Sequence, residues 1–163
     1  MELVYEELNS RTGHEAGRAL LEKTYRRLYG RKMPQILVTE QGKPYFADGS
    51  AHFSISHTKN HVFLCLHHEN VGIDAEETDR HICPELTQRF LSPREQARLE
   101  NAPDRRAALL RLWVLKESYA KLTGRGWGNY LRETDFDPED PRVQMIDGCF
   151  VAVLEEKESN YAV

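Results

Sequence analysis

The chain has 163 residues, of which 40% are hydrophobic and 29% are charged, and this composition suits one globular domain with a buried core. The formal net charge of −4 argues against a generic nucleic-acid binder, because such a protein needs a concentrated basic face. Residues 1–7 lack the pattern of a signal peptide and no segment approaches the ~20 apolar residues of a membrane span, so we expect a soluble, cytoplasmic protein.

The first half of the chain has the pattern of one helix and several short strands. Apolar residues recur at helical spacing before Gly30, and the residues that precede His57 alternate as they do in a strand. In chain order, we predict a strand at 3–5, a helix at 15–29, an extended segment at 36–39, turns at 41–46 and 48–50, and a strand at 53–57.

The second half alternates between strands and helices. Ser92 suits a helix N-cap, Pro93 the first helical turn and Glu95 the capping box, so a helix is expected to begin at this point. In chain order, we predict strands at 62–66 and 71–76, helices at 84–90, 93–101 and 105–122, a loop from 124 to 148, and a strand at 149–154 with 161–163 as its hairpin partner.

Two carboxylates share one face of the predicted strand 71–76. Asp74 and Glu76 are two residues apart, so both side chains project to the same side, with Cα atoms roughly 6.5–7 Å apart. Two neighbouring buried carboxylates are costly unless a cation or a proton neutralises one of them. The pair therefore indicates a divalent metal site, and a plain solvent-facing strand is the alternative.

A third carboxylate lies on the apolar stripe of the predicted helix 105–122. Trp113, Glu117 and Lys121 occupy successive i, i+4 positions, so the carboxylate and the ammonium stack beside a large aromatic ring. An ordinary helix ion pair is the alternative to a functional site. The neighbouring Lys116 is expected to face solvent.

The cysteines and most of the histidines do not form a metal-binding pattern. The three cysteines are widely spaced without a CxxC motif, so neither a zinc site nor a disulfide framework is expected, and two of them are placed in the core. Four histidines lack a partner at a suitable spacing and are expected on the surface or in loops. The core cysteines are Cys65 and Cys149, and the histidines are His61, His67, His68 and His81.

Several motifs in order closely resemble the 4'-phosphopantetheinyl transferases of the surfactin-synthetase-activating (Sfp) type. The resemblance covers roughly residues 41–163, with a weaker likeness in the helix 15–29. It implies an α+β fold in which two small α+β subdomains, approximately 1–67 and 68–163, are related by a pseudo-twofold axis within one monomeric domain. The motifs are Gly42-Lys43-Pro44, Phe53 to Thr58, Val71 to Glu76, Arg89 to Ser92, and Trp113 to Lys121 with Gly124-Arg125-Gly126.

The resemblance implies transfer of the 4'-phosphopantetheine arm of coenzyme A to a serine of an apo acyl or peptidyl carrier protein, with release of adenosine 3',5'-bisphosphate. Mg²⁺ would be held by Asp74, Glu76 and Glu117. Glu117 is also the candidate general base, acting directly or through a metal-bound water, and Lys121 is the family's phosphate-contacting lysine.

Other residues match the family's contacts to coenzyme A. His57 corresponds to a donor to the pyrophosphate, Ser56 to a contact of the 3'-phosphate, and Gly42-Lys43-Pro44 to the adenine pocket. A strand-end polar pair and a simple turn are the respective alternatives. Segment 124–131, with exposed-looking Trp127 and Tyr130, corresponds to the region that faces the carrier protein.

The N-terminal half is shorter than in family members of this type, because only about forty residues precede Gly42. Basic residues that grip the 3'-phosphate are therefore missing, and Arg18, or less readily Arg11, would substitute for them. Two other functions stay open: a non-catalytic coenzyme A-binding module that regulates a synthase, and an unrelated Mg²⁺-dependent phosphotransferase or hydrolase. The choice of carrier protein depends on distributed surface complementarity and is not readable from the sequence.

Overall fold

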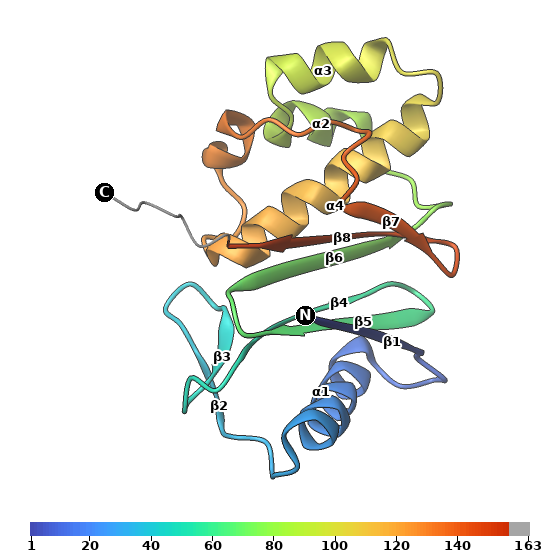
Figure 1. The fold of residues 1–163 in the computed structure, drawn as a ribbon. Coiled ribbons are helices and arrows are strands. Elements are labelled where there is room, and N and C mark those ends of the chain that lie inside the picture. Colours follow the sequence, from blue (N-terminus) through green and yellow to red (C-terminus); the bar gives the residue numbers. More distant parts are fainter. Residues whose placement is uncertain (157–163) are drawn as a thin grey trace.

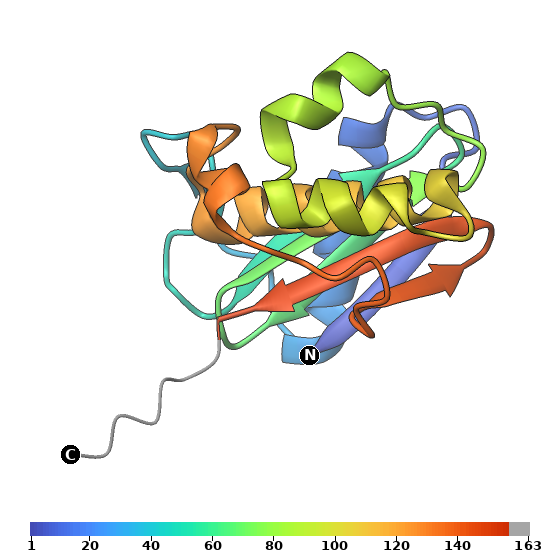
Figure 2. The same ribbon diagram turned by 90° about the horizontal axis from the view of Figure 1, so that it is seen from above.

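Two three-stranded antiparallel sheets lie face to face, and each carries a helix on its outer side (Figure 1). This arrangement is seen in a computed structural model, which describes residues 1–156. The strand orders are β1-β5-β4 and β6-β8-β7, and a small β2-β3 hairpin lies beside the first sheet. Figure 2 shows α4 crossing the outer face of the second sheet. The predicted α+β class is confirmed.

The first sheet is built mainly from the N-terminal part of the chain and is covered by α1. Thr12 caps α1 with a complete capping box to Glu15, and Gly30 ends the helix in the left-handed conformation with a φ of 64°. The elements are β1 (Glu2–Glu7), α1 (Gly13–Tyr29), β2 (Ile36–Val38), β3 (Pro44–Phe46), β4 (His52–His57) and β5 (His61–His67). The predicted strands and helix of this half are present, but residues 44–46, which were predicted as part of a turn, form β3 and pair with β2.

The second sheet and four helical segments follow. The capping box predicted at Ser92 and Glu95 is present at the start of α3. Within residues 1–156, no helix is long and apolar enough to cross a lipid bilayer. The elements are β6 (Val71–Glu77), α2 (Pro84–Phe90), α3 (Pro93–Glu100), α4 (Arg105–Thr123), the 3-10 helix η1 (Asn129–Glu133), β7 (Val143–Ile146) and β8 (Cys149–Glu155).

The prediction of a loop from 124 to 148 was wrong, because this segment contains η1 and β7. Asp147 and Gly148 both have positive φ angles, 47° and 74°, and form a two-residue hairpin turn between β7 and β8. An Asp-Gly pair before a strand is a strong hairpin signal that the sequence analysis missed. The hairpin partner predicted at 161–163 lies outside the described residues.

The two sheets meet along β4 and β6. At this junction serine hydroxyls of β4, in place of backbone carbonyls, accept hydrogen bonds from the backbone N–H groups of β6. The amide N–H of Ile73 donates to Ser54 Oγ at 3.1 Å, and that of Ala75 donates to Ser56 Oγ at 3.2 Å. Ile73 and Ala75 pack in the apolar layer between the sheets, with Phe63 of β5. The intervening acidic residues of β6 therefore face α4.

Close packing of β6 against α4 depends on Gly72. A Cβ atom at this position would lie 2.0 Å from Ser118 O and 2.5 Å from Leu122 N, both backbone atoms of the helix. The substitution Gly72→Ala must therefore push α4 away from the sheet, and we expect it to lower the free energy of unfolding by about 1–3 kcal/mol. Urea unfolding with an unchanged m-value measures this loss.

Gly128→Ala is the matched control for that substitution. Gly128 also has an extended backbone, and its added Cβ would meet only the Tyr130 side chain, at 3.2 Å. A side chain can shift more easily than a packed helix backbone. Equal losses of stability in the two variants would contradict the proposed cost of separating β6 from α4.

Candidate active site

Asp74 is the most enclosed carboxylate of the candidate site. It lies on β6 with 5% of its surface exposed, and its Oδ1 atom accepts hydrogen bonds from Ser56 Oγ and Lys121 Nζ, each at 2.8 Å. Its Oδ2 atom is buried and has no hydrogen-bond partner within residues 1–156. Buried carboxylate oxygens normally have a donor or a cation beside them, so this atom is a suitable ligand for a cation.

Glu76 shares the α4-facing side of β6 with Asp74, as the sequence predicted. Its Oε1 atom accepts from Trp113 Nε1 at 3.1 Å and forms an ion pair with Arg80. Burial raises the pKa of this carboxyl group, and the Arg80 guanidinium partly opposes that rise. The Arg80 guanidinium also lies 5.3 Å from the centre of the Trp113 ring.

Glu117 reaches the same region from α4. Its Oε1 atom accepts from Trp127 Nε1 at 2.8 Å. The pKa of Glu117 is raised to about 7, mainly by burial and in part by the charge of Asp74, while the Lys121 ammonium partly opposes this rise. Lys121 pairs with Asp74 across the β6–α4 interface at 2.8 Å. Within residues 1–156, the helix ion pair between Glu117 and Lys121, considered above as an alternative, is not formed.

The donor chemistry of these three residues fits a divalent cation. Among the residues that the structure describes, no three Asp, Glu, His or Cys side chains form a ready-made metal cluster. Each carboxylate is instead bound to a cation or an indole N–H. The oxygens are nevertheless the hard ligands that Mg²⁺ prefers, and the unpartnered Oδ2 of Asp74 provides one directly.

A cavity of about 280 Å³, called the Lys121 cavity below, is lined by Glu117 but by neither Asp74 nor Glu76. Gly42, Lys43 and Pro44 line it together with Glu117 and Lys121, so the structure brings these predicted residues together. The Lys43 ammonium donates to Leu122 O at 2.7 Å, and burial lowers its pKa. Lys43 thus attaches the 41–44 turn to the C-terminal end of α4.

The remaining predicted residues lie outside the lining of the Lys121 cavity. Ser56 is buried and donates to Asp74, whereas His57 is exposed at the end of β4, with its ring against Gly13 of α1. Arg18 is exposed on α1 and has no partner among the described residues. Arg11 donates to the carbonyls of residues 7 and 8. The structure therefore does not gather these residues into one phosphate-binding cluster.

The profile of the 4'-phosphopantetheinyl transferase superfamily matches residues 70–160, a segment that contains Asp74, Glu76 and Glu117. The chain belongs to this superfamily. Membership contradicts the alternative of an unrelated phosphotransferase or hydrolase.

Curated relatives confirm the resemblance to phosphopantetheinyl transferases of the Sfp type. The 4'-phosphopantetheinyl transferase Sfp of Bacillus subtilis is 36% identical over 90 residues, which cover 53% of this chain and 40% of the relative. A 4'-phosphopantetheinyl transferase of Bacillus pumilus is 34% identical over 115 residues, 68% of this chain and 49% of the relative. The 4'-phosphopantetheinyl transferase AcpT of Salmonella typhi is 35% identical over 144 residues, 85% of this chain and 71% of the relative. The chain spans about half the length of the two Bacillus relatives.

Several site residues of this phosphopantetheinyl transferase family member differ from the sequence-based expectations. Lys116 was expected to face solvent but is fully buried and pairs with Glu95 at 2.7 Å. Tyr130 is buried, whereas Trp127 is 47% exposed as expected. Arg80 was missed, because nothing in its sequence context indicates that it turns back to a carboxylate four residues earlier.

The expectations for the core cysteines and surface histidines were mostly correct. Cys65 and Cys149 are buried, and burial raises their pKa values to about 12 and about 11. His68 and His81 are exposed. Two histidines are corrections: the side chain of His61 is 12% exposed beside Asp147, and that of His67 is 7% exposed beside Glu155.

Proposed function

We propose that this protein transfers the 4'-phosphopantetheine arm of coenzyme A to a serine hydroxyl of an apo acyl or peptidyl carrier protein, in a Mg²⁺-dependent reaction. The proposal includes a monomeric protein that works in the cytoplasm without nucleic acid. It is supported by superfamily membership and by the match of the site residues to the family motifs.

The observation that carries the proposal is the buried Oδ2 atom of Asp74, which has no hydrogen-bond partner within residues 1–156. The other oxygen of Asp74 pairs with Lys121, which lines the Lys121 cavity together with Glu117. A carboxylate oxygen in this state favours a bound cation, and the cavity lies within reach of the same side chains. Asp74, Glu76 and Glu117 would hold Mg²⁺. The bound ion would stabilise the negative charge that develops on the pyrophosphate during transfer.

The side chains of the site suit the remaining steps of the transfer. The acceptor serine oxygen attacks the phosphorus that carries pantetheine, and the bond from that phosphorus to the bridging oxygen breaks, which releases adenosine 3',5'-bisphosphate. Glu117 would take the serine proton, directly or through a water molecule. Lys121, now paired with Asp74, offsets charge on the leaving phosphate.

The Lys121 cavity would hold the donor. Gly42, Lys43 and Pro44 would contact the adenine, and exposed His57 would donate to the pyrophosphate. Ser56 already bonds Asp74, so a contact from Ser56 to the 3'-phosphate would require that bond to be exchanged. Arg18, which is exposed on α1 and has no partner among the described residues, is the basic residue proposed for the 3'-phosphate.

The test of this function is incubation with coenzyme A, Mg²⁺ and a panel of apo carrier proteins from fatty-acid, polyketide and peptide synthesis. We expect mass spectrometry to find a phosphopantetheine adduct on the acceptor serine of at least one carrier, and chelation by EDTA to prevent it. Coenzyme A binding without an adduct on any carrier would instead favour the regulatory, non-catalytic module.

A further inference from the structure

A second and larger cavity, of about 880 Å³, lies between α2 and η1 and is called the Arg89 cavity here. Its lining includes Arg89, Trp113 and Arg132. Trp127 lines this cavity as well as the Lys121 cavity. One indole ring therefore forms part of the wall of both.

The position of this indole is fixed from several directions. Its ring centre lies 5.0 Å from that of Trp113 and 5.7 Å from that of Phe90, which is in edge contact with both indoles. Its Nε1 donates to Glu117 Oε1 at 2.8 Å. Trp127 is nevertheless 47% exposed, whereas Trp113 is 8% exposed, so covering the core does not explain where Trp127 lies.

The two tryptophans hold two different carboxylates of the site. Trp113 Nε1 donates to Glu76 from the buried side, and Trp127 Nε1 donates to Glu117 from the exposed side. A hydrogen bond to a charged acceptor is stronger than one between two neutral groups, so it holds a flexible glutamate side chain more firmly in one direction. Trp127 thereby determines which way the Glu117 carboxylate points.

We propose that Trp127 is a positioning residue for the transfer, because its indole N–H holds Glu117 at the boundary between the Lys121 cavity and the Arg89 cavity. The inference rests on the proposed function, with the donor in the Lys121 cavity. The serine-bearing segment of the acceptor enters from the Arg89 cavity, and the ring of Trp127 keeps the two cavities separate. Glu117 then faces the serine hydroxyl at the point where donor and acceptor meet.

Two substitutions separate the roles of the N–H group and the ring. Trp127→Phe keeps an aromatic ring but removes the donor, and we expect kcat to fall about tenfold to a hundredfold while the KM for coenzyme A is unchanged. Trp127→Ala also removes the wall, so it should lower kcat equally and additionally raise the KM for the carrier protein. Because Trp127 is half-exposed, both variants are expected to fold.

The control is Tyr29→Phe, a change at a partly exposed aromatic residue of α1 that should leave all three constants unchanged. Wild-type kcat in Trp127→Phe would overturn the positioning role, as would a variant in which only the KM for coenzyme A changes. Identical constants for Trp127→Phe and Trp127→Ala would overturn the role of the ring as a wall.

A spectroscopic measurement tests the contact independently of turnover. The chain has 2 tryptophans, so 5-fluorotryptophan labelling of the full chain gives two ¹⁹F signals, and Trp127→Phe assigns them. Replacing Glu117 by alanine, which has no side-chain acceptor, should shift the Trp127 signal more than the Trp113 signal. If the wild type modifies no carrier protein, the proposed function fails, and an unmoved Trp127 signal would separately overturn the contact.

Discussion

The variant Glu117→Gln is expected to transfer phosphopantetheine about 10²–10⁴-fold more slowly than the wild type. Glutamine has nearly the same shape and still accepts a hydrogen bond from Trp127 through its amide oxygen. It cannot take the serine proton, and it supplies no negative charge to a cation. Coenzyme A should therefore still bind, because the rest of the Lys121 cavity is unchanged. Adduct formation followed by mass spectrometry and calorimetric titration with coenzyme A measure the two effects.

Glu100→Gln is the control for this loss, because it makes the same charge change on the exposed side of α3. Its transfer rate should equal that of the wild type. Turnover at the wild-type rate by Glu117→Gln would refute the role of this residue as base and ligand. Loss of coenzyme A affinity together with transfer would show that Glu117 serves mainly in donor binding.

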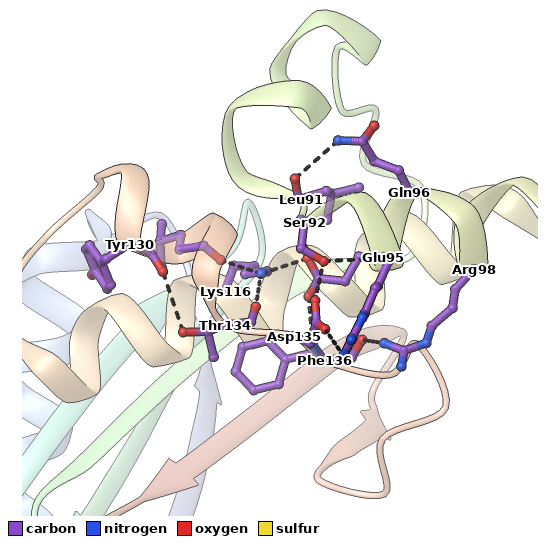
Figure 3. Close-up of polar contacts among 12 residues, drawn as sticks. Leu91, Ser92, Glu95, Gln96, Arg98, Lys116, Tyr130, Thr134, Asp135 and Phe136 are labelled. Carbon is purple, nitrogen blue, oxygen red and sulfur yellow. Dashed lines mark hydrogen bonds and ion pairs between the residues drawn. The ribbon is translucent and has the colours of Figure 1, made fainter.

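The variant Glu95→Ala is expected to lower the free energy of unfolding by about 3–5 kcal/mol, because it leaves a fully buried ammonium without its counter-ion. Lys116 and Glu95 are both 0% exposed and lie 2.7 Å apart. The same ammonium donates to the carbonyls of Leu131 and Thr134, and Glu95 accepts from the amides of Ser92 and Phe136, each at 2.7 Å (Figure 3). The pair thus joins α3 and α4 to η1 and to the residues that follow it.

Urea unfolding of single and double variants tests that expectation. Lys116→Met should also lower the free energy of unfolding. The double variant Lys116→Met with Glu95→Ala should lose less stability than the sum of the two single losses, because it leaves neither a buried ammonium nor a buried carboxylate without its partner. Glu100→Ala on the same helix is exposed and should change stability by about 0.5 kcal/mol or less. Additive losses in the double variant would contradict a direct ion pair.

These two expectations concern adjacent residues of α4 with different surroundings. Glu117 faces the Lys121 cavity, and Lys116 is turned about 100° around the helix into the packing beneath η1. The burial of Lys116 fixes the backbone from Leu131 to Phe136, on the C-terminal side of the loop that carries Trp127. A substitution of Lys116 that destabilises the protein is therefore also expected to weaken the hydrogen bond from Trp127 to Glu117.

Local sequence rules determined the elements that carry the site. The period of two in a strand placed Asp74 and Glu76 on one face, and the helical period placed Glu117 and Lys121 on another. Caps at Thr12 and Ser92 reflect hydrogen bonds within one helical turn, so they are encoded in adjacent residues. The order of motifs was sufficient to indicate the superfamily.

Only the tertiary structure decided which groups meet across elements. Spacing along α4 predicts that Glu117 and Lys121 share a face, but it does not specify that Lys121 pairs with Asp74 of β6. The burial of Lys116 and the contact from Trp127 to Glu117 depend on where η1 and its preceding loop pack, which no local period encodes. The sequence by itself thus determined which carboxylates face α4, and long-range packing decided what holds each of them, because those partners are brought together only by the fold.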